Sequence, residues 1–228
     1  WTNAKADEYG QYGYNKSFLY YNGKEYKNAV YATDKWNIIK NLTVKLGARL
    51  ELHKLDGDYL PSDARTEKWA SKKGTKVDKD YLNKDFTLSL IYRVMKNFGV
   101  TGDAYYIESS NGLSAYKGSN GPDDKVNKVP YFSGGIFYNS KCVSLVSKIT
   151  HISRSNLFGS ASFSNPSGDV SKQTLIYSIS TLGWTTDAIL RPFKGFQMHL
   201  LLTLQNPKYH NFNFDVFGQH YDYDNIQV

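Results

Sequence analysis

The clearest indication of the fold is the stretch Leu42-Thr43-Val44-Lys45-Leu46-Gly47-Ala48-Arg49-Leu50-Glu51-Leu52-His53. Apolar residues take every second position, and the positions between them carry Thr, Lys, Gly, Arg, Glu and His. Such alternation is typical of a β-strand with one apolar and one polar face. Its twelve residues at ~3.3 Å each span about 40 Å, whereas an ordinary strand has about five or six residues. The strand is long enough to cross a membrane at a tilt.

The same alternation recurs between Lys27 and Asn206. Phe86, Leu88 and Leu90 share one face of a strand, and Met198–Leu204 repeats the pattern. The facing of residues 98–108 stays open, because that segment has little apolar bulk. The sequence predicts about eight strands, at roughly 27–38, 42–54, 82–95, 98–108, 129–138, 142–154, 173–189 and 196–206.

The connections between these strands are alternately short and long. Tight turns are expected at 39–41, 95–97, 139–141 and 191–195. Long loops are expected at about 55–81, 109–128 and 156–172, and another irregular stretch follows Pro207. Outer-membrane barrels have short turns on the periplasmic side and long loops outside. The predicted fold is therefore all-β, an antiparallel up-and-down transmembrane β-barrel.

The composition excludes a helical membrane protein but not a barrel. Mean hydropathy is −0.53, and the longest strongly apolar run, Met198–Leu204, is far shorter than the ~20 residues of a membrane-spanning helix. A barrel strand needs apolar residues only at alternate positions. Aromatic residues make up 15% of the chain, with 19 Tyr, a residue that suits both strands and the membrane interface.

Charge and cysteine content remove other classes. The net charge of +7 is spread along the chain without a basic, aromatic-rich stripe, so nucleic acid is not an expected partner. Cys142 is the single cysteine, which excludes a disulfide framework. The sequence from Trp1 has no signal-peptide pattern. We therefore expect the export signal upstream and the chain to be a fragment or a processed product.

Two sets of aromatic residues are candidates for function. Those near strand ends form either a girdle at the membrane interface or ordinary core: Trp36, Tyr92, Phe98, Tyr138 and Trp184. Those in the expected loops either stack on a ligand or pack on one another: Tyr59, Trp69, Tyr116, Phe158, Tyr209, Phe212 and Phe214. We take Trp69 and Tyr116 as the predicted ligand-binding residues.

No pattern indicates covalent chemistry. The five histidines show neither metal-ligand spacing nor a partner for Cys142, and the acidic pairs in the loops lack the pattern of an EF-hand. No phosphate-binding loop or nucleophile elbow is present. The sequence predicts no catalytic residue, no metal and no cofactor, and a protein that is not an enzyme.

One segment resembles the barrel of TonB-dependent outer-membrane receptors, which often carry D-x-W, a short turn and then L-x-x-x-x-G-x-R-x-E. The matching residues here are Asp34, Trp36, Leu42, Gly47, Arg49 and Glu51. Leu204–Tyr209, followed by an aromatic loop, is similar to receptors of this family from Bacteroidetes-type bacteria. With the alternating strands between them, the resemblance covers roughly 27–223.

The resemblance implies a bacterial outer-membrane receptor with an N-terminal plug inside a barrel of about 22 strands. Such receptors take up ferric siderophores, haem, cobalamin or glycans with energy relayed through the periplasm. Residues 1–228 would be a fragment of one barrel domain, without plug or remaining strands. The implied partners are outer-membrane lipid, a periplasmic energy-coupling protein that acts through the absent plug, and a surface lipoprotein. No functional residue is carried over, since the mechanistic residues of the family lie mostly in the absent parts.

Two other functions stay open: a soluble all-β carbohydrate-binding domain, and an eight-stranded outer-membrane enzyme or adhesin. Stability in water without detergent separates the first of these from the receptor. If the barrel interpretation holds, one face contacts lipid and the other lines the lumen. We expect lipid contact at Leu46, Leu50, Leu90, Leu200 and Leu204, and lumen contact at Lys45, Arg49, Arg93 and Gln197.

Overall fold

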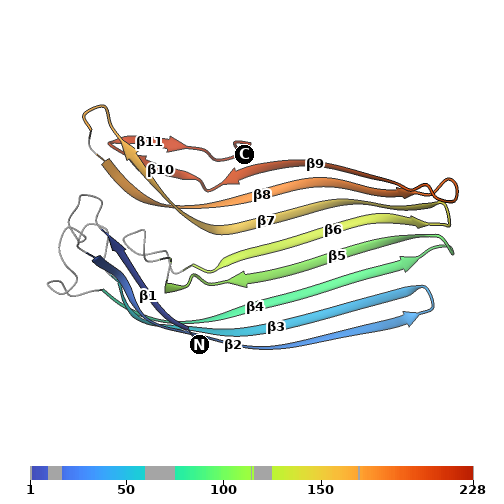
Figure 1. Cartoon of the computed structure of the whole chain (residues 1–228), viewed down its shortest axis with the longest axis horizontal. Helices are drawn as coiled ribbons and strands as arrows, with labels where there is room; N and C mark the ends of the chain where they lie inside the picture. The colour runs from blue at the N-terminus through green and yellow to red at the C-terminus, as the bar shows by residue number, and fades with distance from the viewer. Residues whose placement is uncertain are drawn as a thin grey trace.

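The structure, a computed structural model, describes residues 2–9, 17–59, 75–113, 115, 125–168 and 170–227. In this part of the chain, strands β1 to β9 form one antiparallel sheet in chain order (Figure 1). None of the described residues belongs to a helix that is long and apolar enough to cross a membrane. The strands of the sheet are β1 (Thr2–Tyr9), β2 (Ser17–Ile39), β3 (Leu42–Tyr59), β4 (Thr75–Arg93), β5 (Phe98–Ser109), β6 (Asn127–Asn139), β7 (Val143–Ser164), β8 (Val170–Leu190) and β9 (Met198–His210).

The four expected tight connections are confirmed. They join β2 to β3, β4 to β5, β6 to β7 and β8 to β9, and they lie together at the right-hand end of Figure 1. Backbone hydrogen bonds close these turns, such as Met95 N–H to Phe98 O at 2.9 Å and Ser140 N–H to Val143 O at 2.7 Å. We call this the short-turn end of the sheet, and the opposite end the long-loop end.

Two of the expected irregular segments at the long-loop end are wrong. The loop expected at 156–172 is mostly strand, because β7 and β8 stay paired as far as Ser164 and Val170. The stretch expected to be irregular after Pro207 holds the end of β9 and a separate hairpin of β10 (Asn213–Val216) and β11 (Gln219–Asp222). A further strand, β1, pairs with residues 17–25 of β2. The main sheet therefore has nine described strands where about eight were predicted.

Two adjacent lines of paired residues show that the faces of the sheet differ. One line crosses seven strands as Lys45, Ser89, Asp103, Ser133, Thr150, Gly183 and Gln205. The adjacent line, one residue away on each strand, reads Val44, Leu90, Gly102, Gly134, Ile149, Trp184 and Leu204. Neighbouring residues of a strand point to opposite faces. The sheet thus has a polar and an apolar face.

Glycines reveal which face is concave. On the polar face, a Cβ added at Gly135 would lie 2.1 Å from Ser147 O, and one at Gly99 would lie 2.3 Å from Tyr92 O. On the apolar face, a Cβ at Gly102 would be 3.7 Å from its nearest neighbour, and one at Gly134 would meet nothing within 4 Å. Side chains converge inside a curved sheet and spread outside it. The polar face is therefore the concave face, and the apolar face is the convex face.

The predicted segregation of side chains is confirmed within the strands. Lys45 and Arg49 lie on the concave face, together with Arg93 at the end of β4. The predicted outward set is on the convex face, with exposed fractions from 37% to 55%: Leu46, Leu50, Leu90, Leu200 and Leu204. Gln197 lies in the turn before β9, where it accepts a hydrogen bond from Arg191 Nε. Contact of the convex face with lipid stays a prediction.

Candidate functional site

The concave face carries a polar network in the middle of the sheet. Asp103 of β5 accepts hydrogen bonds from Ser89 of β4 at 2.7 Å and Ser133 of β6 at 3.1 Å. Lys148 of β7 pairs with the same carboxylate at 2.7 Å. The network joins four adjacent strands, and it balances one negative charge with one positive charge. This wall is suited to contact water or a polar molecule.

A second network lies nearer the long-loop end. Arg49 of β3 pairs with Asp85 of β4 at 3.0 Å and also with Glu51. The other oxygen of Glu51 accepts a hydrogen bond of 3.0 Å from Asn83 Nδ2. One guanidinium thus holds two carboxylates on neighbouring strands. Such an arrangement holds the three charged side chains in defined positions on the concave face.

Beyond β5, the chain folds over the concave face. The segment Ser110–Leu113, which we call the strap, crosses β4 and β3 and reaches β2. Ser110 Oγ lies 2.5 Å from His53 Nδ1 on β3 and 3.0 Å from Asn83 Nδ2 on β4. The backbone N–H of Leu113 donates to Glu25 Oε2 on β2 at 3.3 Å. The strap therefore bridges three strands at the long-loop end.

An apolar contact anchors the strap. The side chain of Leu113 is fully buried and packs with Leu55 of β3 and Val77 of β4, with Tyr81 partly covering them. These three buried residues form the described apolar core of the sheet. Burying a Leu side chain contributes ~1.5–3 kcal/mol. Leu113 is thus the main apolar attachment of the strap.

His53 is buried beneath the strap and is neutral in the arrangement that best satisfies its neighbours. Its Nε2 lies 3.1 Å from Glu25 Oε1, so an Nε2–H donates to that carboxylate. Its Nδ1 then accepts from the hydroxyl of Ser110, which in turn accepts from Asn83. Asn83 Oδ1 is buried and has no hydrogen-bond partner among the described residues. This oxygen lies under the closed strap, next to Ser110.

The pKa directions of this cluster agree with a neutral histidine beside a carboxylate. The last apolar residue of the convex band on β3 is Leu52, so His53 and Glu25 lie beyond that band. Burial lowers the pKa of His53, and the positive charge of Lys27 lowers it further. Burial alone would raise the pKa of Glu25, but the hydrogen bond from Lys27 and its charge hold that pKa below the ordinary value.

A second feature of the long-loop end is an aromatic cluster, which joins the β7–β8 hairpin, β9 and the β10–β11 hairpin. Its ring centroids lie 4.9–5.9 Å apart. Tyr209 shares the concave face with Gln205, since both are odd-numbered residues of β9. Most of the rings are half-buried and Tyr223 is exposed, so edges remain open to a ligand. The cluster consists of Phe163, Tyr177, Tyr209, Phe212, Phe214, Tyr221 and Tyr223.

The predicted loop aromatics have different outcomes. Trp69 and Tyr116 lie outside the described residues, so their role stays a prediction. Tyr209, Phe212 and Phe214 are brought together in the aromatic cluster, where they pack on one another. Both interpretations of these rings therefore stay open, because packing leaves part of each surface exposed.

The five predicted girdle residues share the convex face, by the pairing of their strands: Trp36, Tyr92, Phe98, Tyr138 and Trp184. Trp184 lies deeper than the others and donates its indole N–H to Ser147 Oγ at 2.9 Å. Among the described residues, no group of three or more His, Cys, Asp or Glu side chains is placed to hold a metal ion.

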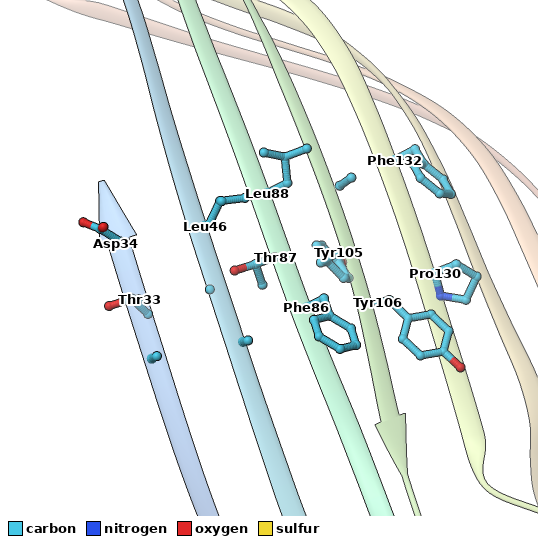
Figure 2. Close-up of a pocket in the computed structure, with 14 residues that line it drawn as sticks. Thr33, Asp34, Leu46, Phe86, Thr87, Leu88, Tyr105, Tyr106, Pro130 and Phe132 are labelled. Atoms are coloured by element: carbon cyan, nitrogen blue, oxygen red, sulfur yellow. The ribbon is translucent and has the colours of Figure 1, made fainter. Parts of the chain in front are cut away.

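A hollow of about 750 Å³ lies over strands β2 to β6, and Figure 2 shows the residues that line it. Phe86, Tyr106 and Phe132, which come from three neighbouring strands, lie along one side of it. Small residues, Ala48 and Ala104 among them, leave the space between the larger side chains. Most residues around the hollow lie on the convex face. It is thus a dent in the apolar surface and not a passage along the concave face.

Sequence reasoning missed the cluster of Glu25, His53, Asn83 and Ser110. In the sequence, His53 stands out only as the last polar position of an alternating strand. Nothing near Ser110 in the sequence indicates that it reaches a residue on β3, since that contact depends on how the chain crosses the sheet.

Comparison with protein-family models finds no match, and no curated protein matches the sequence. Two transporters are among the solved structures with a similar fold. The FrpB iron transporter from Neisseria meningitidis (F3-3 variant) is 14% identical with a TM-score of 0.56, over 83% of this chain and 27% of that chain. Copper transporter OprC is 10% identical with a TM-score of 0.66, over 90% of this chain and 33% of that chain.

At these identities the likeness concerns the fold alone. This chain spans about a third or less of the length of the two transporters. The described sheet runs in order from β1 to β9, and no pairing of β9 with β1 or β2 occurs among the described residues. The chain therefore has the fold of an antiparallel up-and-down transmembrane β-barrel, of which it forms part of the wall.

Proposed function

We propose that this chain is part of the barrel of a bacterial outer-membrane receptor that takes up a large, scarce nutrient by TonB-coupled active transport. The observation that carries the proposal is the opposition of the two faces across long, regularly connected strands. A wall with an apolar outside and a polar inside fits a barrel that separates lipid from a polar lumen. The likeness to two transporters supports the same function.

The alternative of a soluble carbohydrate-binding domain fits the convex face poorly. Large apolar residues on that face are exposed, among them Leu52, Leu82 and Phe86, and they form one continuous surface. Soluble monomers rarely expose a contiguous apolar surface larger than a few hundred Å². In a bilayer the same surface is covered by acyl chains.

The cargo we propose is one of four classes: a ferric siderophore, haem, cobalamin or a glycan. Its recognition would take place at the long-loop end, where Trp69 and Tyr116 are the proposed ligand contacts and the aromatic cluster offers additional rings. Partners would be outer-membrane lipid, a plug domain with its periplasmic energy-coupling protein, and a surface lipoprotein. The protein performs no covalent chemistry in this proposal.

Uptake by cells tests the proposal. Cells with and without the gene of the whole receptor are given labelled samples of a ferric siderophore, haemin, cyanocobalamin and an oligosaccharide, with and without a protonophore. We expect loss of the gene to abolish energy-dependent uptake of one class. Equal uptake of all four classes by both strains would defeat the proposal.

Shortening one loop tests the proposed binding side. Deletion of residues 60–74, which contain Trp69, is expected to reduce uptake at least tenfold and to leave the amount of receptor in the membrane unchanged. Connections tolerate changes of length much better than strands do. As a control, Trp69→Phe keeps a ring and should retain most of the uptake. Full uptake by the deletion variant would remove Trp69 from the binding surface.

A further inference from the structure

The strap is a separate device within this wall, and its position on the concave face suggests a role in passage. Ser110–Leu113 leaves β5 and covers the concave side of β4, β3 and β2 at the long-loop end, where a cargo would enter. Beneath it lie His53, Asn83 and Val77, all nearly or fully buried. A bulky molecule that moves along this side of the wall from the long-loop end would have to pass the strap.

Four contacts to described residues hold the strap. Leu113 provides one apolar anchor against Leu55 and Val77. Ser110 makes polar contacts with His53 and Asn83, and the backbone N–H of Leu113 donates a hydrogen bond to Glu25. No described residue of the strap belongs to a strand. Segments outside the hydrogen-bonded ladder of a sheet open at lower free energy than the paired strands around them.

The closed arrangement is also imperfect. Asn83 Oδ1 is buried under the strap without a hydrogen-bond partner among the described residues. Opening would expose this oxygen to bulk water, which can donate a hydrogen bond to it. Opening would also expose Glu25 and His53, whose hydrogen bonds water can replace. The polar contacts of the strap are therefore replaceable, whereas the burial of Leu113 is not.

We propose that the strap is a latch on the lumen wall, closed by Leu113 and by the Glu25–His53–Ser110 contacts, which must release for the cargo to pass. The claim of passage rests on the proposed transport function. The claim that the strap is closed and can release does not rest on that function, and a separate measurement tests it.

The first measurement is reaction of a buried cysteine with a membrane-impermeant maleimide added to cells. Cys142, which is exposed, is first replaced by Ser. Val77→Cys places a thiol under the strap, and Asp78→Cys places the control thiol next to it on the exposed opposite face. With the native strap, we expect Val77→Cys to react at least tenfold more slowly than Asp78→Cys.

Release of the strap should remove that protection. Leu113→Asp puts a charge into the apolar contact, so Val77→Cys should then react within about threefold of the control thiol. Leu113→Met keeps the volume and should preserve the protection. Unchanged reaction of the Asp78→Cys control shows that the barrel is still assembled. Equal reaction at both positions with the native strap, or no effect of Leu113→Asp, would overturn the latch.

The second measurement tests passage. Asn83→Cys with Ser110→Cys joins positions whose native side-chain atoms lie 3.0 Å apart. With the labelled probe that wild-type cells take up, the oxidised double variant should lose at least tenfold of its energy-dependent uptake, and a reductant should restore it. Unchanged uptake in the crosslinked state would show a fixed strap and overturn the claim of release. Absence of uptake in wild-type cells would instead contradict the proposed function.

Discussion

At the scale of single residues, the space around each glycine shows in which direction the sheet curves. Gly135 and Gly134 are neighbours on β6 that point to opposite faces. A Cβ at Gly135 would lie 2.1 Å from Ser147 O and 2.8 Å from Lys148 Cα, both on the backbone of β7. A Cβ at Gly134 meets nothing. The crowded position therefore needs glycine for the close approach of the two strands.

This pair of residues yields a matched prediction. Gly135→Ala should lower the stability of the detergent-solubilised receptor by ~1–3 kcal/mol, because the two strands must separate to admit the methyl group. Gly134→Ala should leave the stability unchanged or raise it by up to ~1 kcal/mol, since it restricts the unfolded chain at no steric cost. Chemical denaturation followed by fluorescence measures both. An equal loss in the two variants would contradict the assignment of the concave face.

At the scale of elements, the sequence reveals those strands whose two faces differ sharply. Strand β3 starts where predicted, at Leu42, because its alternation is strict. The loop predicted at 156–172 was wrong because its Ser, Asn and Gly residues are typical of turns and because the register shifts between Arg154 and Leu157, which breaks the alternation of β7. Pairing with β8 decides the conformation there. The strap escaped prediction altogether, because its position depends on contacts with β2 and β3.

The hairpin of β10 and β11 depends on the aromatic cluster. Phe212 has ring contacts with Tyr177 of β8, Tyr209 of β9 and Tyr223. Phe212→Ala should release the hairpin from the sheet and speed proteolysis within residues 211–223 at least fivefold. Phe217 is the control, since it is 45% exposed at the hairpin turn. Phe217→Ala should have little effect on cleavage, and equally fast cleavage of both variants would contradict the role of the cluster.

At the scale of the whole molecule, the edges of the sheet need partners. Residues 26–39 of β2 lie beyond the part that β1 pairs. Among the described residues, the far side of β9 is paired only near its end, by the bridge from Lys208 to Gln227 and the backbone hydrogen bonds of Tyr209 with Asn225 and Ile226. In lipid, unpaired backbone groups along a strand cost several kcal/mol each. In water such an edge favours aggregation. We therefore propose that further strands complete the barrel.

A refolding experiment tests this proposal of an incomplete wall. Residues 1–228 alone, folded into detergent, should give aggregates and no species with the heat-dependent gel mobility of a closed barrel. The whole receptor, treated in the same way, should give a single closed species. A monodisperse, detergent-stable barrel formed from residues 1–228 alone would show that these strands close by themselves.

We propose that the convex face contacts lipid while the concave face lines a polar lumen. Labelling of single cysteines in membranes distinguishes the two faces. In a Cys142→Ser background, a water-soluble maleimide is applied to receptors with one cysteine at position 45, 46, 49, 50 or 200. We expect fast reaction at 45 and 49, and protection at 46, 50 and 200. The reason is that a basic residue facing the bilayer midplane costs ~2–4 kcal/mol, whereas an apolar residue costs nothing there. Fast reaction at 46, 50 and 200 with protection at 45 and 49 would contradict this proposal.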